Sequence, residues 1–292
     1  GGPGPAAAPG AGPRARKASE PHEVFFRVKY IDFLGRRVPV VVQNQNGPCP
    51  LLGIVNGLLL RNAVTLRSPG AAEVTLESLL STVCERLLDA NDKALRAGGE
   101  VAANQQKQVS DAISLLPKLA TGVDVNPRFS SIAGFEFTDE IAVFDLLDMN
   151  IVHGWLIDPQ HEAAASIGPK TYNQLMERII DLQSAIAAAE AGGGAGAPGS
   201  AELARMVAEA QGVQDFLADS ASQLTPHGLM ELHAGLKENE VAVLFRNNHF
   251  STIFKRAGKL YVLVTDQGYV TEHKVIWEEL SDVGGNTTQY TV

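Results

Sequence analysis

The first regular pattern of hydrophobic residues along the chain begins at Val24. Two stretches rich in β-branched and aromatic residues, VFFRVKYIDF and RRVPVVVQ, are separated by Leu34-Gly35. Such runs around a short turn predict the two strands of a β-hairpin. Residues 1–22 are rich in Gly, Pro and Ala, a composition that predicts a disordered tail.

A helix-period run follows within QNQNGPCPLLGIVNGLLL, residues 43–60. Its apolar residues recur at the spacing of one helix face: Leu51, Ile54, Val55 and Leu58. Leu52 and Leu59 widen this face, so we expect a central, well-buried helix. Pro50 suits the first turn of that helix, where a missing backbone N–H costs nothing.

The middle of the chain predicts mostly helices. We expect them over residues 75–90, about 103–118, 169–190, 200–218 and 226 to about 238, with EIAVFDLLDM also helical. IVHGWLID predicts a short strand or turn, and TGVDVNPRFSSIAGFEFT predicts a loop-rich, extended segment. The chain then changes to one strand after another in EVAVLFRNNHFSTIFKRAGKLYVLVTDQGY. An early hairpin, many helices and late antiparallel strands indicate the α+β class.

Composition narrows the possible functions. The 292 residues carry a net charge of −9 without a basic stripe, which is a poor match for nucleic acid or an anionic membrane. No apolar run reaches the length of a membrane span. The only two cysteines, Cys49 and Cys84, do not suggest a disulfide framework, so we expect a reducing compartment, cytoplasmic or nucleocytoplasmic. AGGGAGAPGS, residues 191–200, predicts a flexible linker between two helices.

The position of Cys49 suggests chemistry. It stands between Pro48 and Pro50, where a polar loop passes into the expected helix, and Gly47 lets the backbone turn tightly before it. The free N–H groups and dipole of a first helical turn lower the pKa of a cysteine, and the thiolate is the nucleophilic form. The two interpretations are a nucleophile at a helix start and a buried thiol in a turn. Cys84 lies within an apolar helical stripe, which predicts a core residue.

A cysteine nucleophile needs a base, which is usually a histidine distant in sequence. His249 opens the predicted strand HFSTIF. A two-residue turn at Ala257-Gly258 would pair Arg256 with Lys259 and, in the same register, His249 with Asp266. Asp266 would then orient the imidazole, whereas a slip of one residue would move it to the other face of the sheet.

An oxyanion donor would complete the site. Gln43, six residues before Cys49, offers a neutral side-chain amide that could act with the Cys49 backbone N–H. The alternative is that Gln43 only caps the loop. His153, within VHGW, fits either the core or the site. The other histidines lie in the predicted tail or in solvated helical and loop contexts: His22, His161, His227, His233 and His273.

Several long motifs together resemble the MINDY deubiquitinases, a class of cysteine proteases. They are VKYIDFLGRRVPVVVQNQNGPCPLLGIVNGLLL, TGVDVNPRFSSIAGFEFT, VFDLLDMNIVHGWLIDPQ and FRNNHFSTIFKRAGKLYVLVTDQGY, and the resemblance runs from about Val24 to Leu280. It implies a papain-like α+β fold, with a central helix carrying the nucleophile and a late antiparallel sheet carrying the histidine. It also implies a catalytic domain over residues 23–283, with a low-complexity insertion at about 190–200, and a C-terminal tail over 284–292.

The resemblance further implies hydrolysis of lysine isopeptide bonds in polyubiquitin, selective for the linkage that marks proteins for the proteasome. Cys49 matches the family's nucleophile, His249 its general base and Gln43 its oxyanion-hole glutamine. Four positions match the family's contacts with the distal ubiquitin: Val125, Trp155, Tyr172 and Phe245. Phe26 matches, on a weaker local motif, an aromatic that touches the proximal unit. From the residues alone, core packing is the alternative for all five.

Neither a metal nor an organic cofactor is predicted, because the sequence has no Cys/His cluster with ligand spacing. The expected partners are polyubiquitin and ubiquitinated proteins, without nucleic acid or membrane, and the chain is expected to act as a monomer. Two alternatives stay open. One is a catalytically weak ubiquitin-binding module of the same fold, and the other is a thiol amidase or transglutaminase-like enzyme acting on a different acyl group.

Overall fold

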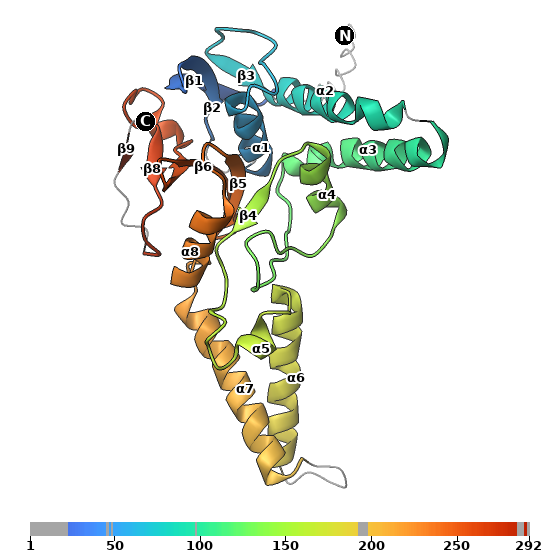
Figure 1. Cartoon of the computed structure of the whole chain (residues 1–292), viewed down its shortest axis with the longest axis vertical. Helices are drawn as coiled ribbons and strands as arrows, with labels where there is room; N and C mark the ends of the chain where they lie inside the picture. Colours follow the sequence, from blue (N-terminus) through green and yellow to red (C-terminus); the bar gives the residue numbers. More distant parts are fainter. Residues whose placement is uncertain are drawn as a thin grey trace, which may run out of the picture.

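The computed structural model describes residues 23–44, 47, 49–96, 98–191, 198–284 and 289–290. Within these residues, two sheets flank a central helix, and two long helical hairpins extend from this body in different directions (Figure 1). The predicted tail over residues 1–22 and most of the predicted linker at 191–200 lie outside the described residues.

The elements confirm the α+β class. The strands are β1 (Phe25–Phe33), β2 (Arg36–Val41), β3 (Glu73–Thr75), β4 (Ile151–His153), β5 (Val241–Arg246), β6 (His249–Arg256), β7 (Lys259–Leu263), β8 (Trp277–Glu279) and β9 (Gln289–Tyr290). The helices are α1 (Cys49–Leu60), α2 (Leu76–Leu95), α3 (Gly99–Leu119), α4 (Asp139–Leu146), α5 (Ala164–Ile167), α6 (Tyr172–Glu190), α7 (Ser200–Asp219) and α8 (Pro226–Gly235), with the 3-10 helix η1 (Gln267–Tyr269).

The first sheet contains the predicted hairpin. Its described strands run in the order β2-β1-β3, all antiparallel. Leu34 and Gly35 have φ of 48° and 74°, the left-handed values that a two-residue type I′ turn requires, and the turn pairs Phe33 with Arg36. β2 is therefore an edge strand of this sheet. The chain continues from the end of β2 at Val41 to Gln43.

The second sheet has the order β4-β5-β6-β7-β8-β9 in the described residues. The strands from β5 to β9 are antiparallel as predicted. The short strand β4, for which no partner was predicted, pairs with β5 in parallel. The turn at Ala257-Gly258 gives the predicted pair of Arg256 with Lys259. At the far edge, β9 pairs with β8, so the sheet extends into the predicted C-terminal tail.

Helix α1 joins the two sheets. From Pro50 to Leu60 its residues are buried, and it packs against β2, β5 and β6 (Figure 1). The Asn56 side chain accepts from the Val41 N–H at 2.8 Å and donates to the Val41 carbonyl at 2.9 Å, which fastens the helix to β2. On the other side, the Thr252 hydroxyl donates to the Gly53 carbonyl at 3.1 Å. The predicted central helix is confirmed.

Four of the remaining helices, α2, α4, α6 and α8, begin after a side-chain cap. Four threonines hold helix N-termini with their hydroxyl oxygens: Thr75, Thr138, Thr171 and Thr225. The predicted pairing of residues 169–190 with 200–218 is observed as the α6–α7 hairpin. The helix expected to reach about 238 ends at Gly235, because Leu236 turns to an extended backbone. Cys84 is half-buried against the core, as predicted.

No helix in the described part of the chain combines the length and apolar character needed to cross a membrane.

Candidate active site

Cys49 is the first residue of α1, and its side chain is half-buried. The helix behind it is immobilised by the packing described above, so the backbone of the sulfur-bearing residue has a fixed place. The thiol hydrogen-bonds to the backbone of Phe250. Since Phe250 directly follows His249 in β6, this contact places the predicted nucleophile against the strand that carries the predicted base.

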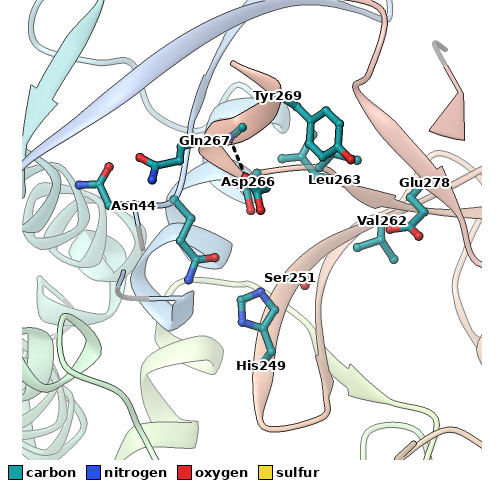
Figure 2. Close-up of a pocket in the computed structure, with 13 residues that line it drawn as sticks. Asn44, His249, Ser251, Val262, Leu263, Asp266, Gln267, Tyr269 and Glu278 are labelled. Carbon is teal, nitrogen blue, oxygen red and sulfur yellow. Dashed lines mark hydrogen bonds between the residues drawn. The ribbon is translucent and has the colours of Figure 1, made fainter. Parts of the chain in front are cut away.

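A tight turn between β5 and β6 places His249. Asn247 and Asn248 have φ of 52° and 56°, values that asparagine tolerates better than most residues, and the turn pairs Arg246 with His249. The imidazole is half-buried and lines a cavity of about 680 Å³. Figure 2 shows the ring directed into this cavity from one side, with Asp266 and Tyr269 on the opposite side.

The cavity lies between the Gln43–Asn44 segment and the connection from β7 to β8. Ser251 and Glu278, which the sequence analysis did not single out, also line it. Ser251 could have been found, because it shares a strand face with His249 two residues away. Burial raises the pKa of Glu278, and the nearby Arg246 guanidinium opposes that shift. An adjoining cavity of about 440 Å³ shares His249 as a wall.

The two predicted oxyanion donors are occupied by the same acceptor. The Gln43 side-chain N–H donates to the Gly47 carbonyl at 3.1 Å, and the Cys49 backbone N–H donates to that carbonyl at 2.9 Å. An oxyanion hole is made from preorganised donors of this kind. A substrate carbonyl can receive the Cys49 N–H only if the Gly47 carbonyl moves away, whereas the Gln43 amide carries a second N–H beside the one bonded to Gly47. Pro48, expected to stiffen this approach, lies outside the described residues.

The thiol and the imidazole are both neutral at rest near pH 7. Burial raises the pKa of the Cys49 thiol, and hydrogen bonds to the backbone of Phe250 and of Cys49 itself only partly oppose this. Burial also lowers the pKa of His249. The helix N-terminus therefore does not outweigh desolvation here, and the resting state combines a neutral thiol with a neutral imidazole. A neutral imidazole is the form that can accept the thiol proton.

Asp266 lies outside the β6–β7 ladder. The last pair of that ladder toward the site is Ile253 with Val262, and β7 ends at Leu263. The Asp266 carboxylate instead accepts from the Gly268 N–H at 2.6 Å and caps η1. It shares the cavity with His249, but in the described residues no hydrogen bond joins the two. Its orienting role stays a prediction.

The four positions matched to distal-ubiquitin contacts differ in exposure. Trp155 and Phe245 are each 6% exposed, Val125 is half-buried, and Tyr172 is 36% exposed. The Trp155 indole N–H donates to the Ser220 hydroxyl at 2.7 Å, and its ring lies 5.4 Å from that of Tyr172. Tyr172 therefore presents the accessible aromatic surface, with Trp155 supporting it from behind. The fifth residue, Phe26, is 1% exposed and belongs to the core.

His153 belongs to the core. Its Nε2 lies 3.0 Å from the Gly134 carbonyl, and its Nδ1 accepts from the Trp155 N–H at 3.2 Å. Burial lowers its pKa to about 4. The neutral His153 ring therefore links the backbone of Gly134 to that of Trp155, and it does not line the cavity. Among the residues with described positions, no three His, Cys, Asp or Glu side chains form a group that could hold a metal ion.

An α+β fold with a thiol at the start of its central helix and an imidazole on the adjoining strand is the arrangement of a cysteine-dependent hydrolase. The family model described as MINDY deubiquitinase matches residues 24–292. The chain belongs to this family.

Similar proteins agree with this assignment. Ubiquitin carboxyl-terminal hydrolase MINDY-1 from Homo sapiens is 41% identical over 276 residues, covering 94% of this chain and 55% of the relative. MINDY-1 from Danio rerio is 42% identical over 273 residues, covering 93% and 49%. MINDY-2 from Mus musculus is 41% identical over 273 residues, covering 93% and 42%. The chain thus spans about half the length of these curated relatives.

Proposed function

We propose that this chain hydrolyses lysine isopeptide bonds in polyubiquitin and is selective for the linkage that targets proteins to the proteasome. The observation that carries the proposal is the meeting of Cys49, through the Phe250 backbone, with the strand that begins at His249. Membership of a deubiquitinase family supplies the substrate class. Residues 23–283 form the catalytic domain in this proposal.

The first half of the reaction acylates the enzyme. His249 takes the proton of the Cys49 thiol, and the thiolate attacks the carbonyl of ubiquitin's C-terminal glycine. The negative charge that develops on the carbonyl oxygen is stabilised by the Gln43 amide and the Cys49 N–H. The Cys49 N–H first exchanges the Gly47 carbonyl for the substrate oxygen, so binding of ubiquitin and assembly of the oxyanion hole are coupled.

The second half releases both products. The imidazolium of His249 protonates the lysine amine of the neighbouring ubiquitin, which leaves as the C–N bond breaks. The same residue then acts as base toward a water that attacks the thioester, and free ubiquitin and the Cys49 thiol are restored. Tyr172, the most exposed of the matched contact residues, is a docking point for the distal ubiquitin in this scheme.

The test is incubation of the purified chain, beside a Cys49→Ala control, with ubiquitin tetramers of each linkage, followed by separation of the products over time. Loss of the proteasome-targeting chains alone, abolished by Cys49→Ala, is the expected result. Loss of several linkages equally would remove the selectivity from the proposal.

Binding separates the alternatives when no linkage is cleaved. Retained binding of ubiquitin chains without cleavage would identify a ubiquitin-binding module. Absence of both cleavage and binding would point to a thiol amidase with a different acyl substrate. A calorimetric titration of the chain with tetra-ubiquitin distinguishes these two outcomes.

A further inference from the structure

Lys29 is a buried lysine in the middle of β1. It is 6% exposed and lies on the same strand face as Ile31 and Phe33, which are also buried. Its ammonium donates to three backbone carbonyls, those of Tyr269 at 3.0 Å, Glu272 at 2.7 Å and Val275 at 2.7 Å. A lysine has three donors and no acceptor. All three N–H groups are therefore used on one distant segment of the chain.

That segment is the connection from β7 to β8, residues 264–276. Its ends are close together, since the Val264 N–H donates to the Ile276 carbonyl at 2.9 Å. It has the length and closed shape of an Ω-loop. Its tip carries Asp266, Gln267 and Tyr269 along the wall of the cavity that faces His249 (Figure 2).

The same loop touches the segment that supplies the oxyanion donor. The Gln43 backbone N–H donates to the Thr265 carbonyl at 2.7 Å, and Gln43 forms a parallel bridge with Asp266. Lys29 pairs with Val40 in β2, and β2 leads into Gln43 two residues after it ends. One ammonium thus connects the hairpin that precedes Gln43 to the loop on which Gln43 rests.

We propose that Lys29 is a positioning residue of the active site. By holding the loop 264–276 against β1, it fixes the loop's Thr265 carbonyl, to which Gln43 is hydrogen-bonded, and so sets where the Gln43 amide can meet the substrate oxygen. This inference rests on the proposed function. Three carbonyl acceptors make the contact specific to a lysine, because no neutral side chain of that length offers three donors.

The chain offers a matched control in Lys255. Its ammonium also donates to backbone carbonyls, those of His233 and of Leu236 at 2.8 Å, but these end α8, away from the cavity. Lys29→Met and Lys255→Met both remove a cation from a set of carbonyls. Only the first changes the support of Gln43.

The experiment measures kcat and KM for cleavage of a ubiquitin dimer of the proteasome-targeting linkage by the wild type, Lys29→Met, Lys255→Met, Gln43→Ala and the Lys29→Met/Gln43→Ala double variant. Lys29→Met is expected to lower kcat at least about tenfold with KM nearly unchanged. Lys255→Met keeps kcat within about twofold. Since Lys29 acts through Gln43, the double variant should be about as slow as Gln43→Ala alone.

Three results would overturn the proposal. They are a kcat of Lys29→Met within about twofold of wild type, equal losses in both lysine variants, or a double variant as slow as the product of the two single effects. If Lys29→Met does not fold, Lys29→Gln takes its place. Because glutamine retains two donors, the same changes in kcat are expected with a smaller magnitude.

Backbone amide hydrogen exchange keeps this inference separate from the proposed function. Faster exchange over residues 264–276 and at the Gln43 N–H is expected in Lys29→Met but not in Lys255→Met. That result supports the positioning role even if the wild type cleaves no ubiquitin chain, in which case only the proposed function fails. Unchanged exchange in Lys29→Met rejects the role of Lys29 whatever the activity.

Discussion

The two sides of the active site are built differently. On the side of Cys49, α1 is enclosed by β2, β5 and β6, and Asn56 and Thr252 tie its backbone to both sheets. On the side of Gln43, a backbone hydrogen bond from Gln43 to Thr265 links the end of the first hairpin to the loop 264–276, and most side chains of that loop are half-buried or exposed. The proposed nucleophile is anchored to the core, whereas the proposed oxyanion donor is supported by loop residues.

This difference separates stability from catalysis. A substitution on the α1 side removes buried interactions and should lower the free energy of unfolding, since buried groups that lose partners are costly. A substitution on the loop side removes bonds that water can replace, so the fold persists while the geometry at the reacting carbonyl changes.

The largest effect is expected for Asn56→Leu. The substitution leaves the buried N–H and carbonyl of Val41 without partners, at about 2 kcal/mol each, so the free energy of unfolding should fall by about 4 kcal/mol. Urea unfolding followed by circular dichroism measures this. The comparison variant is Gln43→Ala, for which a loss below about 1 kcal/mol is expected because its single bond is half-exposed. Similar losses in both variants would contradict the proposed difference between the two sides.

Gln43→Ala should instead lower kcat. Removal of one oxyanion donor raises the barrier by about 3 kcal/mol, or roughly 10²-fold in rate, with little change in KM. Gln43→Glu keeps the shape but replaces the donor with a carboxylate, so it should be at least as slow. Steady-state cleavage of a ubiquitin dimer gives both constants. A kcat within about threefold of wild type would exclude Gln43 from the oxyanion hole.

The free energy of unfolding should also depend on pH through the buried His153. The folded pKa is about 4 and the unfolded value about 6.5, so the unfolded chain binds the extra proton as the pH falls between them. Stability present above pH 6.5 is therefore lost on acidification, by about 2 kcal/mol at pH 5. Unfolding free energies at pH 7.5 and 5 in wild type and His153→Gln measure the effect. An identical pH dependence in the two proteins would show that His153 is not the group responsible.

Sequence patterns predicted the helices and hairpins that are determined by residues close together in the sequence. The wide apolar face within residues 51–60 predicted a buried helix, and the turn residues at Leu34-Gly35 and Ala257-Gly258 predicted both hairpins. The parallel pairing of β4 with β5 was missed, because those strands are almost ninety residues apart and no local signal sets their direction. The positions of Cys49 at the start of a helix and of His249 at the start of a strand were likewise predictable from their neighbours.

The parts of the site that depend on tertiary contacts could not be predicted. Extending the β6–β7 register to Asp266 assumed a strand that in fact ends at Leu263. The helix-start argument suggested a lowered pKa for Cys49, but burial by the surrounding chain raises it. Lys29 is a charged residue whose burial nothing in its own strand indicates, yet a loop more than 230 residues later covers it. Exposure and desolvation are properties of the assembled fold.

The smallest effect is expected for Thr252→Val, on the α1 side. The valine preserves the shape and β-branching of the side chain but removes the hydroxyl that donates to Gly53, so the free energy of unfolding should fall by about 1 kcal/mol. The Gly53 carbonyl also belongs to α1, so its ordinary helical acceptor role is retained and the penalty stays small. Activity should be unchanged, because α1 keeps its remaining anchors and Cys49 its place. A tenfold loss of kcat with normal stability would mean that this single bond, rather than the surrounding packing, positions the nucleophile.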